Sequence, residues 1–157
     1  MKVSAKDTFF FYSLTMIRPF EPQDTDAVLD IWLRGSVSAH SFIDRTYWEK
    51  QTDAMRRRYL PSARTFIHQD ETTGRLTGFV SLIGNFVAAL FVDPDRQSEG
   101  IGRSLLEQAG TLHESLRLNV YAENRKAVRF YRRQGFRIVR RQNDPHTGRE
   151  ELCMQRG

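Results

Sequence analysis

The sequence predicts one α/β (α+β) domain, and three observations support that prediction. A short apolar strand at residues 86–92 runs through a glycine-containing loop directly into an amphipathic helix. A second, alternating strand at residues 116–121 is followed at once by a helix with Asn124 in the capping position. The chain has 157 residues, of which 39% are hydrophobic, and this is enough for one core.

The first part of the domain is expected to contain two helices. Asp24 is a suitable N-cap for a first helix, which is expected to stop near Gly35. Thr46 and Glu49 have the spacing of a capping box, which predicts the start of a second helix. Pro61 is expected to end that helix.

The middle and end of the chain predict strands separated by turns and two further helices. One helix is expected at about residues 102–113, and the other starts after Asn124 and ends before Gly135, which suits the left-handed position past a helix end. The predicted strands are 65–69, 76–82, 86–92, 116–121, 136–141 and 151–155.

The loop between the strand at 86–92 and the next helix has the features of an anion site. Gly100 and Gly102 let the backbone approach a ligand closely, and the following helix adds unpaired N–H groups at the positive end of its dipole. No Gly-Lys-Ser/Thr follows, so the loop is not a Walker phosphate loop, and the dinucleotide fingerprint lacks its third glycine. A helix cap without a ligand is the alternative for so short a pattern.

A second segment, residues 124–136, makes the anion site the stronger interpretation. Ala127, Phe130 and Tyr131 share one face of its helix. Together the two segments read Gln97-x-x-Gly100-x-Gly102 and Asn124-x-x-Ala127-x-x-Phe130-Tyr131-x-x-x-Gly135-Phe136. In this order and separation they resemble the paired motifs of the GNAT superfamily of acyl-CoA-dependent N-acyltransferases.

The resemblance implies a fold and a reaction. The implied fold is a mixed, mostly antiparallel, twisted sheet of about six to seven strands with about four helices, in which the central parallel pair splays apart to admit the cofactor. It would occupy residues 16–157, with residues 1–15 either an N-terminal extension or a lengthened first strand. The implied activity is direct transfer of the acetyl group of acetyl-CoA, in a ternary complex, to a primary amine on a small molecule, a peptide N-terminus or a protein lysine.

The resemblance also assigns cofactor contacts. The pantetheine arm would lie along the strand before the loop, and the pyrophosphate would bind the loop amides. The cofactor-binding residues implied in this way are Leu90, Phe91, Val92, Gln97, Ser98, Glu99, Gly100, Ile101, Gly102, Arg103, Asn124, Ala127, Phe130 and Tyr131.

Two loop residues depart from the family pattern. Ser98 replaces a frequent glycine, and Glu99 puts a negative charge beside the expected anion site. A solvent-facing Glu99 would cost little because water and salt screen its charge, whereas an inward-facing one would weaken cofactor binding. Arginines that flank the motifs are candidates to grip the 3′-phosphate of coenzyme A, namely Arg103, Arg125 and Arg133.

Aminolysis of a thioester requires an acid for the leaving thiolate and a base for the amine. Tyr131 stands where the family places a phenolic general acid, and a phenol stays protonated at neutral pH. No glutamate lies on the strand at 86–92, so the candidate bases are His40, Asp44 and Glu123, or a chain of waters. His40 is equally a candidate acceptor contact, and it would share the acceptor pocket with Trp32 and Phe42.

Composition narrows the remaining options. The mean hydropathy is −0.54, which excludes a membrane-spanning protein, and the lone Cys153 cannot form an internal disulfide, so we expect a cytoplasmic protein. No Cys/His cluster has metal-binding spacing. The net charge of +5 makes an arginine-rich nucleic-acid-associated protein a minor alternative, and a non-catalytic acyl-CoA-binding module is another. A homodimer is left open.

Overall fold

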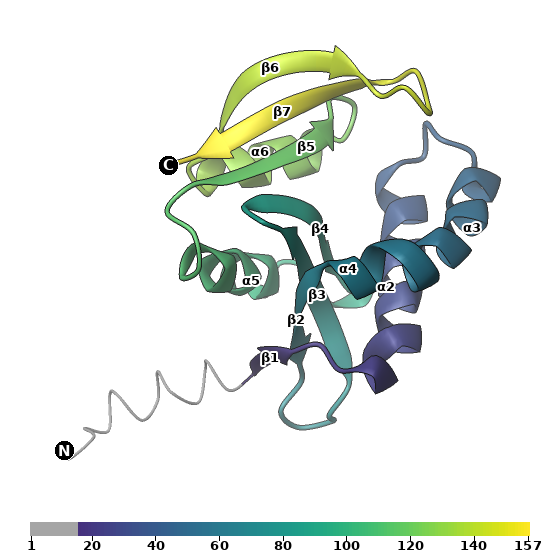
Figure 1. The fold of residues 1–157 in the computed structure, drawn as a ribbon, viewed down its shortest axis with the longest axis vertical. Helices are drawn as coiled ribbons and strands as arrows, with labels where there is room; N and C mark the ends of the chain where they lie inside the picture. Colours follow the sequence, from purple (N-terminus) through teal and green to yellow (C-terminus); the bar gives the residue numbers. More distant parts are fainter. Residues whose placement is uncertain (1–15) are drawn as a thin grey trace.

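A computed structural model describes residues 16–157, and its centre is one seven-stranded sheet (Figure 1). The expectation for residues 1–15 lies outside the described residues. The spatial order of the strands is β1-β2-β3-β4-β5-β7-β6. Their bounds are β1 (Ile17–Pro19), β2 (Arg64–Gln69), β3 (Leu76–Ile83), β4 (Phe86–Val92), β5 (Leu116–Tyr121), β6 (Arg137–Asn143) and β7 (Glu150–Arg156).

Helices cover both faces of this sheet. They are α2 (Thr25–Ala39), a second run made of α3 (Arg45–Ala54), the π-helical turn η2 (Met55–Tyr59) and α4 (Leu60–Ser62), then α5 (Ile101–Gly110) and α6 (Arg125–Arg133). Short 3₁₀ turns precede α2 and α5, at η1 (Pro22–Asp24) and η3 (Pro94–Arg96). Within residues 16–157 only β4 and β5 pair in parallel and every other strand pair is antiparallel, which confirms the predicted mixed sheet.

The parallel pair is open over most of its length. β4 and β5 share a single register pair, Phe86 with Arg117, and beyond it the two strands separate. β4 carries a β-bulge two residues after Phe86, since Ser81 of β3 pairs with Ala89 while Leu82 pairs with Val87, which leaves Ala88 as the extra residue. A bulge bends its strand and increases its twist. The predicted splay of the central pair is therefore confirmed.

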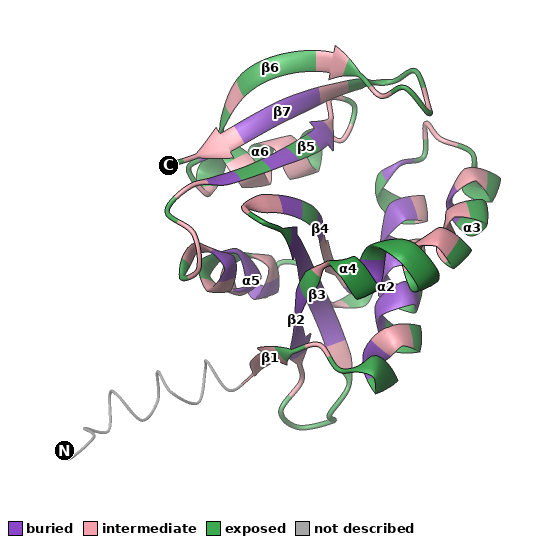
Figure 2. Cartoon of the chain, in the orientation of Figure 1, coloured by how far each residue is buried: buried purple, intermediate pink, exposed green. Residues whose placement is uncertain are grey.

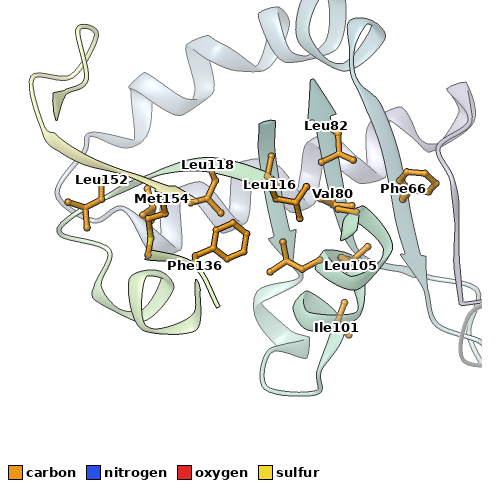
Figure 3. Close-up of a cluster of buried hydrophobic side chains, with 14 residues drawn as sticks. Phe66, Val80, Leu82, Ile101, Leu105, Leu116, Leu118, Phe136, Leu152 and Met154 are labelled. Carbon is orange, nitrogen blue, oxygen red and sulfur yellow. The ribbon is translucent and has the colours of Figure 1, made fainter. Parts of the chain in front are cut away.

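Two hydrophobic clusters hold the helices on the sheet, and buried positions follow the inner faces of strands and helices (Figure 2). One cluster joins α5 and α6 to the sheet, and Figure 3 shows its centre, where Leu105 and Ile101 lie under Val80 and Leu116. The other joins α2 and α3 to the opposite face through residues such as Trp32. Burial of these side chains supplies the main driving force for the fold.

The predicted stop of α2 at Gly35 is wrong. The helix continues to Ala39. A Cβ built on Gly35 would lie 2.7 Å from Cδ1 of Phe91, so this glycine permits close packing of α2 on β4. Asp24 stands at the N-cap position, but its side chain makes no cap and instead binds Arg18 and the backbone N–H of Glu21.

The predicted start of α3 is also wrong in detail. The cap is Asp44, whose Oδ1 accepts from the backbone N–H of Thr46 at 2.8 Å, and Glu49 pairs with Arg45 in place of closing a capping box. The helical run passes Pro61 and ends at Ser62, because a proline is tolerated in the first turn of the short α4 segment. Helix α5 ends at Gly110, three residues before the predicted end at His113.

No helix within residues 16–157 combines the length and the apolar character needed to cross a bilayer.

Candidate active site

A cleft of about 520 Å³ opens where β4 and β5 separate. It runs from the loop before α5, past the N-terminus of α6, to the end of α2. Residues predicted as site residues that line it are Trp32, His40, Leu90, Phe91, Val92, Gln97, Ser98, Gly100, Ile101, Gly102, Arg103, Asn124, Ala127, Phe130 and Tyr131. Glu99, Phe42 and Glu123 are not among its lining residues.

The loop at residues 97–103 presents free backbone amides. Within the described part of the chain, no protein group accepts a hydrogen bond from these N–H groups, and the helical ladder of α5 begins only with Ser104 N–H bonding to Gly100 O at 3.0 Å. Gly100 has a φ of 81°, and nothing lies within 4 Å of where its Cβ would be. Unpaired amides at a helix N-terminus form an anion site.

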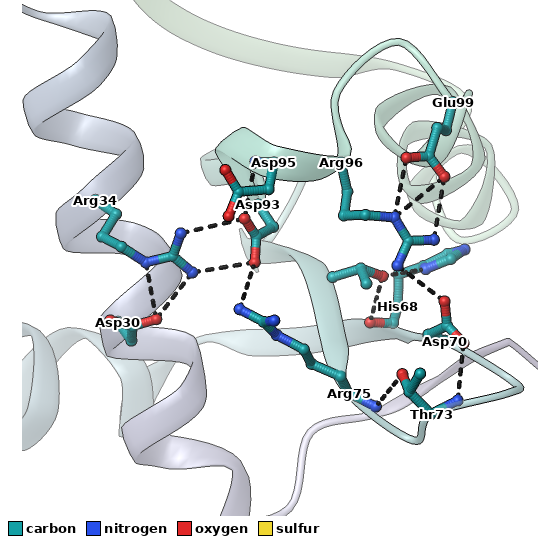
Figure 4. Close-up of polar contacts among 11 residues, drawn as sticks. Asp30, Arg34, His68, Asp70, Thr73, Arg75, Asp93, Asp95, Arg96 and Glu99 are labelled. Atoms are coloured by element: carbon teal, nitrogen blue, oxygen red, sulfur yellow. Dashed lines mark hydrogen bonds and ion pairs between the residues drawn. The ribbon is translucent and has the colours of Figure 1, made fainter.

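Glu99 does not line the cleft beside these amides. Its carboxylate is held by the Arg96 guanidinium at 2.9 Å, and Arg96 in turn binds Asp70 at 2.8 Å (Figure 4). The Arg96 guanidinium lowers the pKa of Glu99. The negative charge of Glu99, which would weaken cofactor binding if it faced the loop amides, is thus neutralised by Arg96.

The strand end before the loop is fixed by a buried carboxylate that the sequence did not single out. Asp93 is 1% exposed, and it accepts bonds from both terminal nitrogens of Arg34 at 3.1 and 3.0 Å (Figure 4). It also accepts from the backbone N–H of Asp95 at 2.9 Å. The Arg34 guanidinium lowers the pKa of Asp93, so the group stays ionised. This pair ties α2 to the start of the loop.

The backbone of Leu90 faces the open gap. Asp93 N–H bonds to Thr77 O of β3 at 2.8 Å, and hydrogen-bonded positions alternate along an antiparallel pair. Phe91 and Ala89 therefore bond to β3 through their main chains. The main-chain groups of Leu90 point the other way, toward β5, with which β4 does not pair at this level.

Tyr131 lies on the inner face of α6, beside the cleft. Its ring meets Phe130 and Phe136 edge-on, with centroids at 5.3 and 5.6 Å. Burial raises the pKa of its phenol. Among residues 16–157 the hydroxyl has no hydrogen-bond partner.

His40 lies at the other end of the cleft, at the C-terminus of α2. It is 8% exposed, and its ring stacks on Trp48 with centroids at 5.0 Å. Burial lowers its pKa, so the imidazole is neutral at pH 7. Its Nε2 is 3.5 Å from Nδ2 of Asn124, whose Oδ1 caps α6 through the Ala127 N–H.

Two other candidate bases are engaged elsewhere. Asp44 is exposed and caps α3, and the Thr46 N–H that it accepts lowers its pKa. Glu123 is exposed and pairs with Arg149 at 3.1 Å. Arg149 also donates to the backbone oxygen of Phe42 at 2.9 Å. The Phe42 ring meets the His40 ring edge-on.

The structure adds cleft residues that the motifs did not indicate. Tyr121 meets the His40 ring edge-on at 5.3 Å and donates its hydroxyl to Asp144. Burial raises the pKa of Tyr121 most, and the hydrogen bond to Asp144 raises it further. Glu151 of β7 also lines the cleft. Both residues lie on strands whose register is set by distant pairing, so no local signal identified them.

The candidate phosphate-binding arginines divide into two groups. Arg103 and Arg133 line the cleft, and Arg125 does not. Lys126 joins them, with its Nζ donating to Oε1 of Gln97 at 2.9 Å. Three cationic side chains therefore line the same cleft as the free amides.

Comparison with known proteins shows the family. The family described as "Acetyltransferase (GNAT) domain" matches residues 61–138. The peptidyl-lysine N-acetyltransferase YiaC of Escherichia coli K12 is 38% identical over 125 residues, which are 79% of this chain and 84% of YiaC. The chain belongs to the GNAT acetyltransferase family. Membership makes it an N-acetyltransferase, which confirms the predicted enzyme class.

Solved GNAT structures share the fold. Apo YjaB from Escherichia coli matches with a TM-score of 0.78 at 30% identity, covering 88% of this chain and 95% of YjaB. The PaiA N-acetyltransferase of Thermoplasma acidophilum, solved in complex with coenzyme A, matches with a TM-score of 0.72 at 17% identity, over 89% of this chain and 96% of PaiA. The GNAT architecture expected from the two motifs is thereby confirmed.

Proposed function

We propose that this GNAT enzyme acetylates the ε-amine of lysine in a peptide or protein, with acetyl-CoA as donor. Acetyl-CoA as the acetyl donor is supported by the row of free amides in the loop at residues 97–103, which lines the cleft. The acceptor half is supported by YiaC, a peptidyl-lysine N-acetyltransferase by name, to which the chain is similar over 79% of its length.

The donor would lie along β4. Its pyrophosphate would take the amides of Ser98, Gly100, Gly102 and Arg103, which gain from the dipole of α5. Its pantetheine arm would pair with the free backbone edge of β4 at residues 90–92, as an added strand does. The Leu90 N–H would then stand near the thioester and stabilise the oxyanion of the tetrahedral intermediate.

Tyr131 would act as the general acid. The leaving thiolate has a conjugate acid of pKa about 8.5, by analogy with cysteine, and departs more readily when it takes a proton. The raised pKa of the Tyr131 phenol keeps that proton available across the physiological range. Asn124 would hold the arm of the cofactor while it caps α6.

The acceptor would enter from the side of His40 and Trp32. The neutral His40 ring, fixed between Trp48 and Tyr121, would be a wall and a polar contact for the acceptor. Its lowered pKa leaves it a weak base toward an ammonium group, whose pKa is about 10.4 for lysine.

A thiol-release assay with acetyl-CoA tests the proposal. The acceptor panel is a lysine peptide with a blocked N-terminus, the same peptide with the lysine acetylated and its N-terminus free, and small amines. We expect release of coenzyme A with the first acceptor, and mass spectrometry should place one acetyl group on lysine. Turnover only with small amines or only with the free N-terminus would contradict the lysine assignment.

A further inference from the structure

One carboxylate lies in the cleft, within the part of the chain that the structure describes, and it belongs to Glu151. Glu151 is the register partner of Tyr121 across β5 and β7, so their side chains share one face of the sheet. The neighbouring Leu152 belongs to the opposite face, in the cluster with α5 and α6. Glu151 is thus on the same side of the sheet as Tyr121 and His40, at the acceptor end.

This carboxylate is held in place from one side only. Gln142 of β6 donates its Nε2 to Oε1 of Glu151 at 2.6 Å, and Arg140 donates to the amide oxygen of Gln142 at 2.8 Å. Because Arg140 occupies that oxygen, the NH₂ group of Gln142 has to face Glu151. No ion pair joins Glu151 to a cation among residues 16–157. The second oxygen, Oε2, has no partner there either.

The surrounding carboxylates are occupied. Glu123 pairs with Arg149, and Glu150 pairs with Arg141. Asp144 accepts from Tyr121. Glu151 is therefore the one acidic group of this region that both reaches the cleft and lacks a cationic partner. A partly buried carboxylate without a cation is a suitable partner for an incoming ammonium group.

We propose that Glu151 binds the ammonium of the acceptor lysine and takes one of its protons. This inference rests on the proposed function. The neutral amine then attacks the thioester carbon, a C–N bond forms, and the C–S bond breaks with the electron pair leaving on sulfur. Tyr131 protonates the thiolate, and the remaining excess proton on nitrogen returns to the phenolate. Glu151 gives its proton to water, so the balance is one amide, one thiol and one proton.

The test compares Glu151→Gln with Glu150→Gln. The two positions are adjacent on β7 but face opposite sides, and Gln at 151 keeps an oxygen for the Gln142 bond. With a lysine peptide at pH 7.5, we expect kcat/KM to fall about 100-fold in Glu151→Gln. In Glu150→Gln we expect kcat/KM to stay unchanged. Acetyl-CoA affinity by calorimetry should be unchanged in both, which shows that the variants are folded.

The pH profile separates this role from a structural one. The groups that face Glu151 are Tyr121 on β5 and Arg140 on β6. The deficit of Glu151→Gln should shrink as pH rises toward about 10, because lysine then loses its proton without help. An equal kcat/KM for the two variants, or a deficit that is constant with pH, would overturn the inference while lysine acetylation by the wild type stands. A wild type inactive on lysine would overturn both.

Discussion

Gly35 of α2 lies directly against Phe91 of β4. A Cβ there would lie 2.7 Å from Cδ1 and 3.3 Å from Cε1 of Phe91, and ordinary carbon contacts are about 3.5–4.0 Å. Phe91 cannot retreat freely, because it stacks at 5.8 Å on Phe79, which is 0% exposed. Gly35→Ala therefore forces Phe91 to move, either against Phe79 or into the cleft that it lines.

The expected cost of this change is worked from two opposing effects. Overpacking typically costs about 1–3 kcal/mol, whereas replacing glycine by alanine inside a helix gains about 1 kcal/mol. The net expectation is a loss of about 0–2 kcal/mol. Gly110→Ala is the matched control, since its Cβ would meet only the flexible end of Arg156, at 3.0 Å. That variant is expected to be neutral or slightly more stable.

Urea and thermal unfolding measure the difference between the two variants. Gly35→Ala should be less stable than Gly110→Ala by about 1–3 kcal/mol, with about 2–4 °C in Tm for each kcal/mol. Because Phe91 lines the cleft, acetyl-CoA affinity should also fall in Gly35→Ala alone. The reasoning is refuted if Gly35→Ala equals the control in stability and affinity.

Three further predictions follow from the site. Tyr131→Phe keeps the ring packing and should lower kcat about 100-fold with little change in acetyl-CoA affinity, and an unchanged kcat in the thiol-release assay would remove the acid role. Ser98 has a φ of 66°, so Ser98→Gly should raise stability by up to about 1 kcal/mol, and a lower melting temperature would contradict the strain. The Thr73 N–H and the Arg96 guanidinium lower the pKa of Asp70 to about 2. Its stabilising contribution is present above the unfolded pKa of about 3.9 and is lost as pH falls toward the folded value, so Asp70→Asn should flatten the stability curve in this window, and parallel curves would contradict this.

Local sequence signals predicted the strands and the loop well. Residues 86–92 and 116–121 form strands with the predicted bounds, because alternation and flanking turn residues are local properties. The free amides at 97–103 follow from the glycines and the helix start. The two motifs are near each other in sequence, so they also predicted residues that line one cleft together.

Signals that depend on distant partners failed. A glycine in a helical pattern suggests that the helix ends there. The reason for Gly35 is instead its close contact with Phe91, which is distant in sequence and cannot be read from the local pattern. Thr46 has the sequence pattern of an N-cap, but the N-cap is Asp44, whose Oδ1 accepts a hydrogen bond from the Thr46 N–H. Glu151 could not be recognised, since its place in the cleft depends on the register between β5 and β7.

The central claim is that the amides at residues 98–103 bind the pyrophosphate of coenzyme A. Titration of the ¹⁵N-labelled protein with coenzyme A, followed by amide resonances, tests it most directly. The account predicts that the amides of Ser98, Gly100, Gly102 and Arg103 show the largest downfield shifts, with inorganic pyrophosphate shifting the same set more weakly. Saturable binding that leaves these resonances in place would contradict it.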